Sequence, residues 1–164
     1  HVTFVQMGGT IDKDYPRMQG GYAFEITDPA VGRILQSVNC GFTHDTVSVC
    51  KKDSQELTIE DRQSLLEMMR RVDSKNFIVT HGTDTMIETA KYVAAAKGRL
   101  QKTVVFTGAM RPQKLIDSDA AFNIGVAVGA LNVIGAGVYV CMNGRLFEAG
   151  RVRRDGRTGH FVSL

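Results

Sequence analysis

The sequence predicts an α/β fold of the three-layer, Rossmann-like (doubly wound) type, in which a mostly parallel sheet carries helices on both faces. Three observations support this prediction. Short apolar, β-branched runs alternate with stretches of helical periodicity through the chain. Several of the strand-like runs end in turns rich in Gly, Thr and Asp. The length of 164 residues suits one domain, and no internal repeat or low-complexity tract divides it.

The composition is that of a soluble, folded protein. Hydrophobic residues make up 43% of the chain and charged residues 23%, which is enough for an ordinary apolar core. The formal net charge of +3 is small, and the two basic clusters, at residues 51–52 and 151–154, are not interleaved with aromatic side chains. No apolar run approaches the length of a membrane span. We therefore expect no direct nucleic-acid partner and no membrane partner.

The number and spacing of the cysteines indicate whether the protein resides in a reducing or an oxidising compartment. Cys40, Cys50 and Cys141 are an odd set without C-x-x-C spacing, so neither a disulfide framework nor a zinc site is predicted, and no metal is expected. This pattern favours a reducing compartment, the cytoplasm. His1 stands where an initiating Met would be expected, so a removed signal peptide and a periplasmic location stay open.

The first strand is expected at Val2–Val5, a β-rich run closed by a Gly-Gly-Thr-Ile turn. The two glycines allow a sharp turn, which presents the Thr10 hydroxyl at the carboxyl end of the strand. Residues 12–21 are polar and without a period, and we interpret them as a mobile loop of the kind that serves as a lid. Tyr15 and Tyr22 are the side chains of this region with the longest reach.

The next helix is expected to begin with Asp28 as its N-cap and Pro29 at its first helical position. Thr43–Val49 is β-branched enough for a second strand, which ends in a polar turn. Thr58 is expected to cap the helix that follows, with Asp61 at the third position after the cap. The predicted apolar faces are Val31, Ile34, Leu35 and Val38 in the first helix, and Leu65, Met68, Met69 and Val72 in the second.

A central strand, Phe77–Val79, is followed by the turn His-Gly-Thr-Asp-Thr and then by a segment of helical periodicity. Gly82 allows another backbone to come close. Thr83 and Thr85 present hydroxyls beside the carboxylate of Asp84 at the start of the helix, where anionic groups of a substrate are favoured. The alternative is structural, because Thr and Asp are also good helix caps.

The rest of the chain continues the alternation. Thr103–Phe106 is predicted as a strand, and Asp117 or Ser118 as the start of a helix. A Gly-Ala-Gly sequence leads to a further strand at Val138–Cys141, and the Arg- and Gly-rich tail ends in Phe161-Val162, a short edge strand. The predicted apolar face of the last helix consists of Ala121, Ile124, Gly125 and Val128.

On this topology, the carboxyl ends of the parallel strands share one edge of the sheet, where open α/β sheets bind ligands. The side chains expected there are those of Thr10, Ser54, Thr83, Asp84 and Thr107. Hydroxyls beside one carboxylate fit a small polar ligand that carries an ammonium and a carboxylate group. A Thr hydroxyl would be the nucleophile of a reaction at this site, and it would need activation.

His81 lies in the central turn, where it either pins the turn by hydrogen bonds or transfers a proton. A dinucleotide cofactor is not favoured. The Gly-Gly-Thr-Ile turn lacks the G-x-G-x-x-G spacing, no P-loop pattern occurs, and residues 135–137 (Gly-Ala-Gly) precede a strand instead of following one. We therefore expect no cofactor.

Four motifs in order resemble the amino-terminal domain of the bacterial-type L-asparaginases. They are Gly8-Gly9-Thr10-Ile11, Asp53-Ser54-Gln55, His81-Gly82-Thr83-Asp84-Thr85 and Thr107-Gly108-Ala109-Met110-Arg111-Pro112. The family includes glutaminase-asparaginases and an archaeal tRNA-dependent amidotransferase subunit, and the resemblance extends to about Asn143. It implies hydrolysis of the side-chain amide of asparagine, or of glutamine, to the acid and ammonia, with no metal or organic cofactor.

The resemblance also implies catalytic roles. Thr10 resembles the nucleophile, and Tyr22 the lid tyrosine that hydrogen-bonds to it, with Tyr15 as the alternative. Thr83 belongs to the second catalytic group, which ends in a Lys in the family. Ungapped counting places Arg154 at that position, and Arg cannot accept a proton as a tuned Lys can. Arg154 can still supply positive potential.

The substrate-binding residues implied by the resemblance are Gly9, Ser54, Gln55, Thr83, Asp84 and Ala109, and Asp84 belongs to the catalytic set as well. Ser54 and Gln55 resemble the residues that hold the substrate α-carboxylate. Asp84 would meet the substrate ammonium, and the Ala109 carbonyl would lie near the amide nitrogen. Turn amides would meet the tetrahedral oxyanion.

By the same resemblance, residues 1–164 form the amino-terminal α/β domain, and the family's carboxy-terminal domain is absent from them. The native protein is then longer or the domain has other work. Three hypotheses follow: an asparagine amidohydrolase, an amino-acid-binding or regulatory domain that has lost turnover, and a subunit of a tRNA-dependent amidotransferase. We also expect a homo-oligomer that associates through the helices flanking the sheet.

Overall fold

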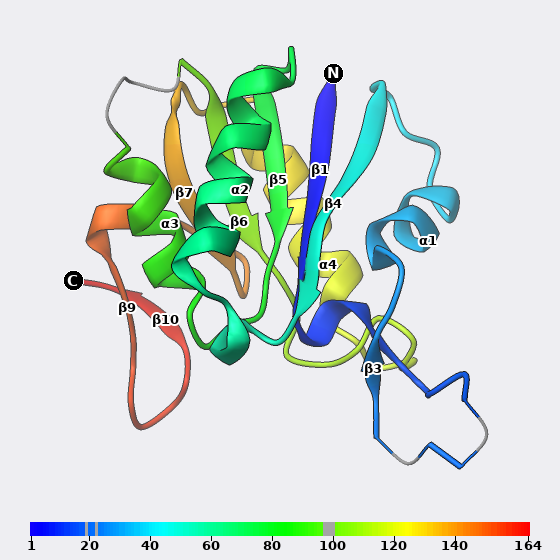
Figure 1. The fold of residues 1–164 in the computed structure, drawn as a ribbon. Helices are drawn as coiled ribbons and strands as arrows, with labels where there is room; N and C mark the ends of the chain where they lie inside the picture. The colour runs from blue at the N-terminus through cyan, green and yellow to red at the C-terminus, as the bar shows by residue number, and fades with distance from the viewer. Residues whose placement is uncertain (19, 22, 97–100) are drawn as a thin grey trace.

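A six-stranded sheet forms the centre of the computed structural model, which describes residues 1–18, 20–21, 23–96 and 101–164. The strand order is β4-β1-β5-β6-β7-β8 (Figure 1). The first five strands in this order are parallel, and β8 runs antiparallel to β7. The strands are β1 (Val2–Gly8), β4 (His44–Lys52), β5 (Asn76–Thr80), β6 (Thr103–Thr107), β7 (Gly137–Met142) and β8 (Arg145–Glu148).

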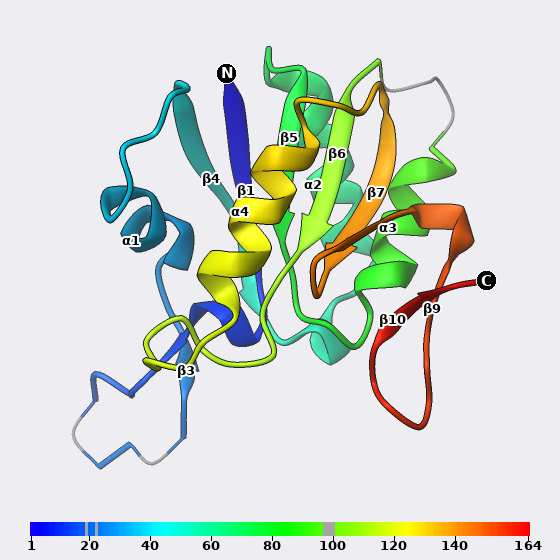
Figure 2. The same cartoon turned by 180° about the vertical axis from the view of Figure 1, so that it is seen from behind.

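Four helices cover the two faces of the sheet, which confirms the predicted three-layer α/β fold. α2 and α3 pack on one face, and α1 and α4 lie on the other, as Figures 1 and 2 show from opposite sides. The helices are α1 (Ala30–Gln36), α2 (Ile59–Arg71), α3 (Met86–Ala94) and α4 (Ala120–Ala130).

The strands are apolar along their length because both faces of the sheet are buried. In β1, Val5 and Met7 point into the core shared with α2 and α3, whereas Val2 and Phe4 point into the core shared with α1 and α4. All seven residues of β1 are buried. The period of two along a strand therefore divides one continuous apolar run between two separate cores.

Two small hairpins lie at the carboxyl edge of the sheet (Figure 1). The first is the β2–β3 arm, formed by β2 (Lys13–Asp14) and β3 (Glu25–Ile26), and the second is formed by β9 (Val152–Arg154) and β10 (Phe161–Ser163). The predicted strand at Phe161-Val162 is thus present, in this ribbon and not at the edge of the main sheet. Among the described residues there are also three short 3-10 turns: η1 (Thr10–Asp12), η2 (Ser54–Glu56) and η3 (Ala149–Arg151).

The expectation of a mobile loop over residues 12–21 is wrong at its first residues. Asp12 is fully buried in η1, and Lys13 and Asp14 pair with Ile26 and Glu25. The sequence pattern did not reveal this because each paired run is only two residues long, which is too short to show a period.

The start of α1 also differs from the prediction. Pro29 precedes the first helical residue, and the predicted cap Asp28 instead pairs with Lys51 at 2.9 Å. The N–H group of Ala30 donates to the carboxylate of Asp12 at 2.7 Å. A buried carboxylate distant in sequence therefore caps this helix, and local propensity cannot show such a partner.

The predicted face of α4 is rotated relative to the observed one. The helix begins at Ala120, after Asp117 and Ser118, and the predicted face residues Ala121 and Gly125 are exposed. The buried residues are Ala120, Asn123, Ile124 and Ala127. Because α4 carries apolar or small residues on all sides, periodicity alone could not fix its orientation.

β8 was not predicted, although the sequence contains a signal for it. Asn143 and Gly144 connect β7 to β8 with φ angles of 53° and 77°. Two successive residues with positive φ are typical of the tight turns that join antiparallel strands, and Asn-Gly is the preferred pair for them.

None of the helices in the described part of the chain has the length and hydropathy needed to span a bilayer.

The predicted N-cap of α2 is confirmed. The Thr58 hydroxyl accepts the N–H of Asp61, and the Asp61 carboxylate accepts the N–H of Thr58 at 2.8 Å. This reciprocal pair satisfies two backbone donors at the start of the helix.

The substitution Thr58→Ala should lower the free energy of unfolding by about 1 kcal/mol, because it removes the side-chain acceptor of the cap. Urea denaturation followed by circular dichroism measures the change. Thr58→Ser keeps the hydroxyl and serves as the control, so an equal loss in both variants would contradict the assignment of the cap.

Candidate active site

Three turns meet at the carboxyl edge of the sheet. Because β1 lies between β4 and β5, the turns that follow these three strands are neighbours. Thr10 begins the 3-10 turn after β1, and Ser54 begins the one after β4. Thr83 and Asp84 lie between β5 and α3. The structure thus brings together the turns that carry four of the five residues expected at this edge.

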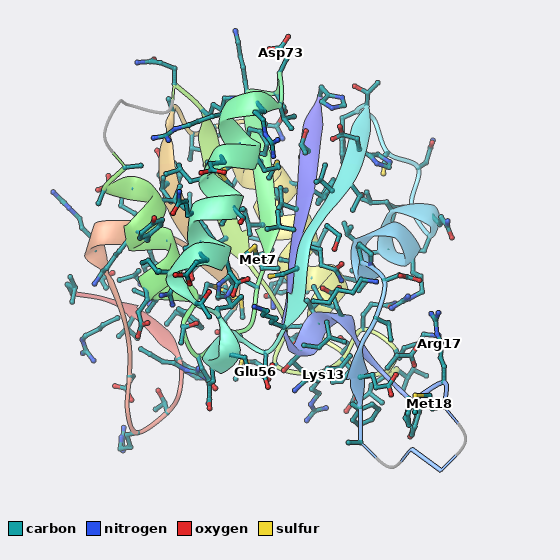
Figure 3. The ribbon with its side chains drawn as sticks, in the orientation of Figure 1. Met7, Lys13, Arg17, Met18, Glu56 and Asp73 are labelled. Atoms are coloured by element: carbon teal, nitrogen blue, oxygen red, sulfur yellow. The ribbon has the colours of Figure 1, made fainter. Side chains whose placement is uncertain are left out.

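An ion pair joins the first two of these turns. Lys13 Nζ lies 3.2 Å from Asp53 Oδ2, and the N–H of Gln55 donates to Asp53 Oδ1 at 3.2 Å. The Gln55 N–H group is the largest influence holding the pKa of Asp53 below its ordinary value. Figure 3 shows Lys13 and Glu56 at this end of the molecule and Asp73 at the opposite end.

Glycines allow the turns to touch through their backbones. Gly9 has a φ of 87°, and a Cβ atom on it would lie 2.3 Å from the backbone nitrogen of Gly82. A Cβ atom on Gly82 would lie 2.7 Å from Ser54 Oγ. Both positions therefore exclude any larger residue, since real Cβ contacts are not this short.

The carboxylate of Asp84 accepts hydrogen bonds from two side chains at this edge. Gln55 Nε2 donates to Asp84 Oδ2 at 2.7 Å, and Arg154 Nη1 donates to Asp84 Oδ1 at 2.9 Å. Arg154 Nη1 also lies 3.4 Å from the Thr83 hydroxyl, and Arg154 Nε donates to the Gly159 carbonyl at 3.0 Å. The β9–β10 ribbon therefore places Arg154 beside Thr83, the residue with which the resemblance groups it, and beside Asp84.

Two predicted hydroxyls bond to partners other than the side chains that converge at this edge. Thr107 is fully buried, and its hydroxyl points toward Met142 Sδ at 3.8 Å, so the expectation that it would converge with the others is wrong. The alternation of side chains along β6 turns it into the core. Thr85 donates its hydroxyl to the Ser54 carbonyl at 2.7 Å and so ties two turns together.

Ala109 is buried in the turn after β6, and the half-buried Asp119 and the buried Asn123 hold this turn. The Asp119 carboxylate accepts the N–H of Met110 at 3.0 Å, and Asn123 Nδ2 donates to the Gly108 carbonyl at 3.0 Å. The sequence analysis missed Asp119 and Asn123. A polar residue on a face that is otherwise apolar, as Asn123 is on α4, was the available signal.

Thr10 is partly exposed at the start of η1. Tyr22, the expected lid tyrosine, lies outside the described residues. Tyr15, the alternative, is 69% exposed on the β2–β3 arm, where its ring packs on Phe24 with centroids 4.9 Å apart.

His81 is fully buried and hydrogen-bonded at both ring nitrogens. Nδ1 lies 2.7 Å from the Gly82 carbonyl, and Nε2 lies 2.9 Å from the hydroxyl of Thr89 in α3. A carbonyl only accepts, so Nδ1 carries the proton and Nε2 accepts from Thr89. Burial lowers the pKa of His81 to about 4, which keeps the ring neutral. The geometry favours the pinning role over proton transfer.

The family model described as "Asparaginase, N-terminal" matches residues 1–159 of the chain. The chain belongs to the asparaginase family. "Probable L-asparaginase 1" of Schizosaccharomyces pombe is 32% identical over 168 residues, which cover 91% of this chain and 44% of that protein. A "Glutaminase-asparaginase" of Pseudomonas fluorescens biotype A is 35% identical over 101 residues, or 56% of this chain and 27% of that protein.

A solved structure supports the fold of this asparaginase-family chain. The thermostable L-asparaginase from Thermococcus kodakarensis superposes with a TM-score of 0.86 at 23% identity, over 99% of this chain and 51% of that one. This asparaginase-family chain thus spans about half the length of the proteins it matches. Within its described residues, no three His, Cys, Asp or Glu side chains could together hold a metal ion.

The neutral His81 makes the stability of this asparaginase-family chain depend on pH. Between pH 6.5 and about 4 the unfolded state takes up a proton that the folded state does not, so His81 favours folding fully above pH 6.5 and less as the pH falls. The loss is on the order of 3 kcal/mol. We expect His81→Gln to show a smaller loss of stability between pH 7 and pH 4 than the unmodified chain, measured by urea denaturation at each pH.

The difference between the two proteins at each pH isolates His81, because other groups titrate equally in both. Asp12, whose pKa is raised to about 6, acts in the opposite sense in this window, since its folded form takes up the proton first. Parallel pH profiles for the two proteins would show that His81 is not the group responsible.

Proposed function

We propose that this chain carries the nucleophile of an amidohydrolase that converts L-asparagine, and L-glutamine as an alternative substrate, to the acid and ammonia. The observation that carries the proposal is the approach of Gly9, next to Thr10, to Gly82 in the turn of Thr83 and Asp84, where Gln55 and Arg154 bond to Asp84. Membership in the asparaginase family and the names of the relatives support it. One methylene separates the two substrates, so the shape of the pocket would set the preference.

In the proposed reaction, the Thr10 hydroxyl attacks the side-chain amide carbon and forms a tetrahedral intermediate. Backbone N–H groups of the turns would stabilise the oxyanion, which is usually a large share of such catalysis. The amide nitrogen takes up the proton that the Thr10 hydroxyl has lost and leaves as ammonia, and water then hydrolyses the acyl-enzyme to release the acid and restore Thr10. Tyr22 is proposed to hydrogen-bond the nucleophile, and Thr83 to take part in the second catalytic group.

The substrate is proposed to bind through its two charged ends. Ser54 and Gln55 would hold the α-carboxylate with the backbone at Gly9, and Asp84 would receive the α-ammonium. The Ala109 carbonyl would lie near the amide nitrogen. Gln55 already donates to the Asp84 carboxylate at 2.7 Å, so a bound ammonium would share this acceptor with an amide that is in place.

Arg154 supports a second candidate function, a domain that binds the amino acid with impaired turnover. Its guanidinium occupies one oxygen of Asp84 and stays protonated at any working pH. It therefore supplies positive potential beside Thr83 but cannot accept a proton. We infer that activation of the nucleophile is slower than it would be with a Lys at this position.

Ammonia release from L-asparagine and L-glutamine by the full chain tests these two functions. Thr10→Ala should reduce release by a factor on the order of 10³ or more, because it removes the nucleophile. Arg154→Lys should raise kcat about tenfold or more, because Lys can act as a general base. A coupled assay for ammonia measures both.

Two matched variants serve as controls: Thr43→Ala, at the opposite end of β4, and Arg153→Lys, the neighbour of Arg154 on β9. Ammonia release that persists in Thr10→Ala would overturn the assignment of the nucleophile. Absence of release from both the unmodified chain and Arg154→Lys, with a rise in melting temperature on adding asparagine, would favour the binding domain.

We also propose a cytoplasmic location, with the periplasm as the alternative. Cys141 is buried, Cys40 and Cys50 are half-buried, and all three thiols are free. Free thiols persist in reducing compartments. Cell fractionation with an antibody against the chain would test this location.

We further propose that the chain forms a homo-oligomer through the outer face of α4. The run from Ala120 to Asn143 contains no charged residue, and Phe122 and Val133 are 60% and 82% exposed. A helix that is apolar on all sides is normally buried. A second copy fits this face because two uncharged surfaces meet without like-charge repulsion.

Phe122→Glu should shift the chain toward the monomer, since it places a charge on this face. Sedimentation equilibrium measures the mass in solution. Gln63→Glu introduces the same residue on the exposed side of α2 and should leave the mass unchanged. A mass that is the same in Phe122→Glu and the unmodified chain would show that α4 is not the interface.

A further inference from the structure

A carboxylate is buried two residues after Thr10, and the proposed reaction gives it no role. Asp12 is 0% exposed. Its Oδ1 accepts the N–H of Ala30 at 2.7 Å, and its Oδ2 accepts a bond from Gln6 Nε2 at 3.0 Å. Removing a carboxylate from water is costly unless its oxygens are well bonded. These two bonds therefore hold the charge in one place.

Gln6 extends the contacts of Asp12 into the sheet. Its Nε2 also donates to the Thr27 carbonyl at 2.8 Å, and its Oε1 accepts the hydroxyl of Ser48 at 2.7 Å. Thr27 donates its N–H and its hydroxyl to the Asp12 carbonyl at 2.9 and 3.2 Å. The network joins β1, β4, the turn that carries Thr10 and the residue after β3.

The same bonds close the root of the β2–β3 arm. The arm leaves the body of the protein after Asp12 and returns at Thr27, and these two residues are bonded to each other. Figure 1 shows the arm extending from the lower end of β1 beside the start of α1. A displacement of Asp12 would therefore move the arm and the turn of Thr10 together.

Thr10 is held from both sides within its turn. Before it, Gly9 is fixed by its close contact with the turn after β5. After it, the Asp12 N–H donates to the Gly9 carbonyl at 3.1 Å, and the Ile11 carbonyl accepts the N–H of Gln113 at 3.2 Å. The side chain of Asp12 adds a further anchor to this turn. It reaches both the sheet, at Gln6 of β1, and the first residue of α1, Ala30.

We propose that Asp12 is a positioning residue for Thr10, whose ionised carboxylate clamps the turn of the nucleophile and the root of the β2–β3 arm to α1 and the sheet. The inference rests on the proposed function, because it gives Asp12 a part in orienting the nucleophile of that reaction. Asp12 does not touch the reacting atoms. It restricts the positions of the Thr10 hydroxyl, and a small misplacement of a reacting group can reduce a rate by about a hundredfold.

The clamp requires the ionised carboxylate. Gln6 Nε2 donates to both Asp12 Oδ2 and the Thr27 carbonyl. A proton on Asp12 Oδ2 would point at the Gln6 Nε2 donor. If the Gln6 amide turned so that its Oε1 accepted this proton, Oε1 would also lie against the Thr27 carbonyl oxygen, and two acceptors would face each other. A proton on Oδ1 would face the N–H of Ala30. Protonation at either oxygen therefore breaks at least one bond of the network.

The environment of Asp12 places its protonation in a pH range in which activity can be measured. Burial raises its pKa to about 6, against the lowering effects of the Ala30 N–H, the Gln6 amide and the charges of Arg33 and Lys51. These two cations face the carboxylate from α1 and β4, and the groups that hydrogen-bond to it, the Gln6 amide of β1 and the Ala30 N–H, are neutral. Because the folded state takes up the proton between about pH 6 and 3.8, protonation of Asp12 stabilises the fold while it loosens the clamp.

The test is Asp12→Asn in the full chain. Asn keeps the size of Asp and one oxygen for the N–H of Ala30, but it sets an NH₂ group against the NH₂ group of Gln6. We expect kcat for L-asparagine to fall by about tenfold to a hundredfold and KM to change by less than about twofold. In the unmodified chain we expect kcat to fall as the pH drops below about 6, where Asp12 takes up a proton, and we expect this fall to be absent from Asp12→Asn.

Asp28→Asn is the matched control, because Asp28 is an exposed carboxylate beside the same start of α1, and its kcat and pH profile should be unchanged. Ser48→Ala is a milder second variant that removes one bond to Gln6 and leaves Asp12 intact. It should lower kcat less than Asp12→Asn, with KM again unchanged. An unaltered kcat and pH profile in Asp12→Asn, or an equal loss in Asp28→Asn, would overturn the proposal.

Hydrogen exchange supplies a measurement that does not depend on activity. At pH 7, the backbone amides of residues 8–14 and 25–28 should exchange faster in Asp12→Asn than in the unmodified chain. The same amides should exchange as slowly in Asp28→Asn as in the unmodified chain. Unchanged exchange in Asp12→Asn would overturn the clamp. If the unmodified chain releases no ammonia while exchange responds as expected, the proposed function fails and the clamp stands.

Discussion

The contact between the backbones of Gly9 and Gly82 is the constraint on which the candidate site depends. β1 and β5 are adjacent parallel strands with Gln6 opposite Thr80, so their turns leave the sheet at the same level. The turns can pack directly because neither glycine has a Cβ atom, and Ser54 fits against the other side of Gly82. Three chain segments therefore converge within hydrogen-bonding distance of one another.

Buried polar side chains form a second layer behind these turns. His81 fixes the turn after β5, Asn123 fixes the turn after β6, and Asp12 fixes the turn after β1. Each is buried and makes at least two hydrogen bonds, as polar groups removed from water must. Moving such a group away from its partners costs free energy, because it would be left buried without its hydrogen bonds. These groups therefore hold the turns, and the exposed reactive groups on them, more firmly than apolar contacts of the same size could.

The positive charge beside Asp84 comes from a distant part of the chain. Arg154 reaches Asp84 from the β9–β10 ribbon, where the Gly159 carbonyl orients its guanidinium and the ring of Phe161 lies 5.6 Å from it. Its side chain is 28% exposed and that of Asp84 is 49% exposed, so solvent screens the pair and its contribution to folding is small. The pair therefore matters more for the electrostatics of the site than for stability.

The sequence by itself determined the alternation of strands and helices, the cap at Thr58 and the motifs that carry Thr10, Ser54, Thr83 and Asp84. These features depend on local periodicity, local hydrogen bonds and turn chemistry, all of which short segments express. Only the tertiary structure decided the face of α4, the burial of Thr107 and the capping of α1 by Asp12. The physical reason is that each of these depends on a partner distant in the chain, which local propensity does not contain.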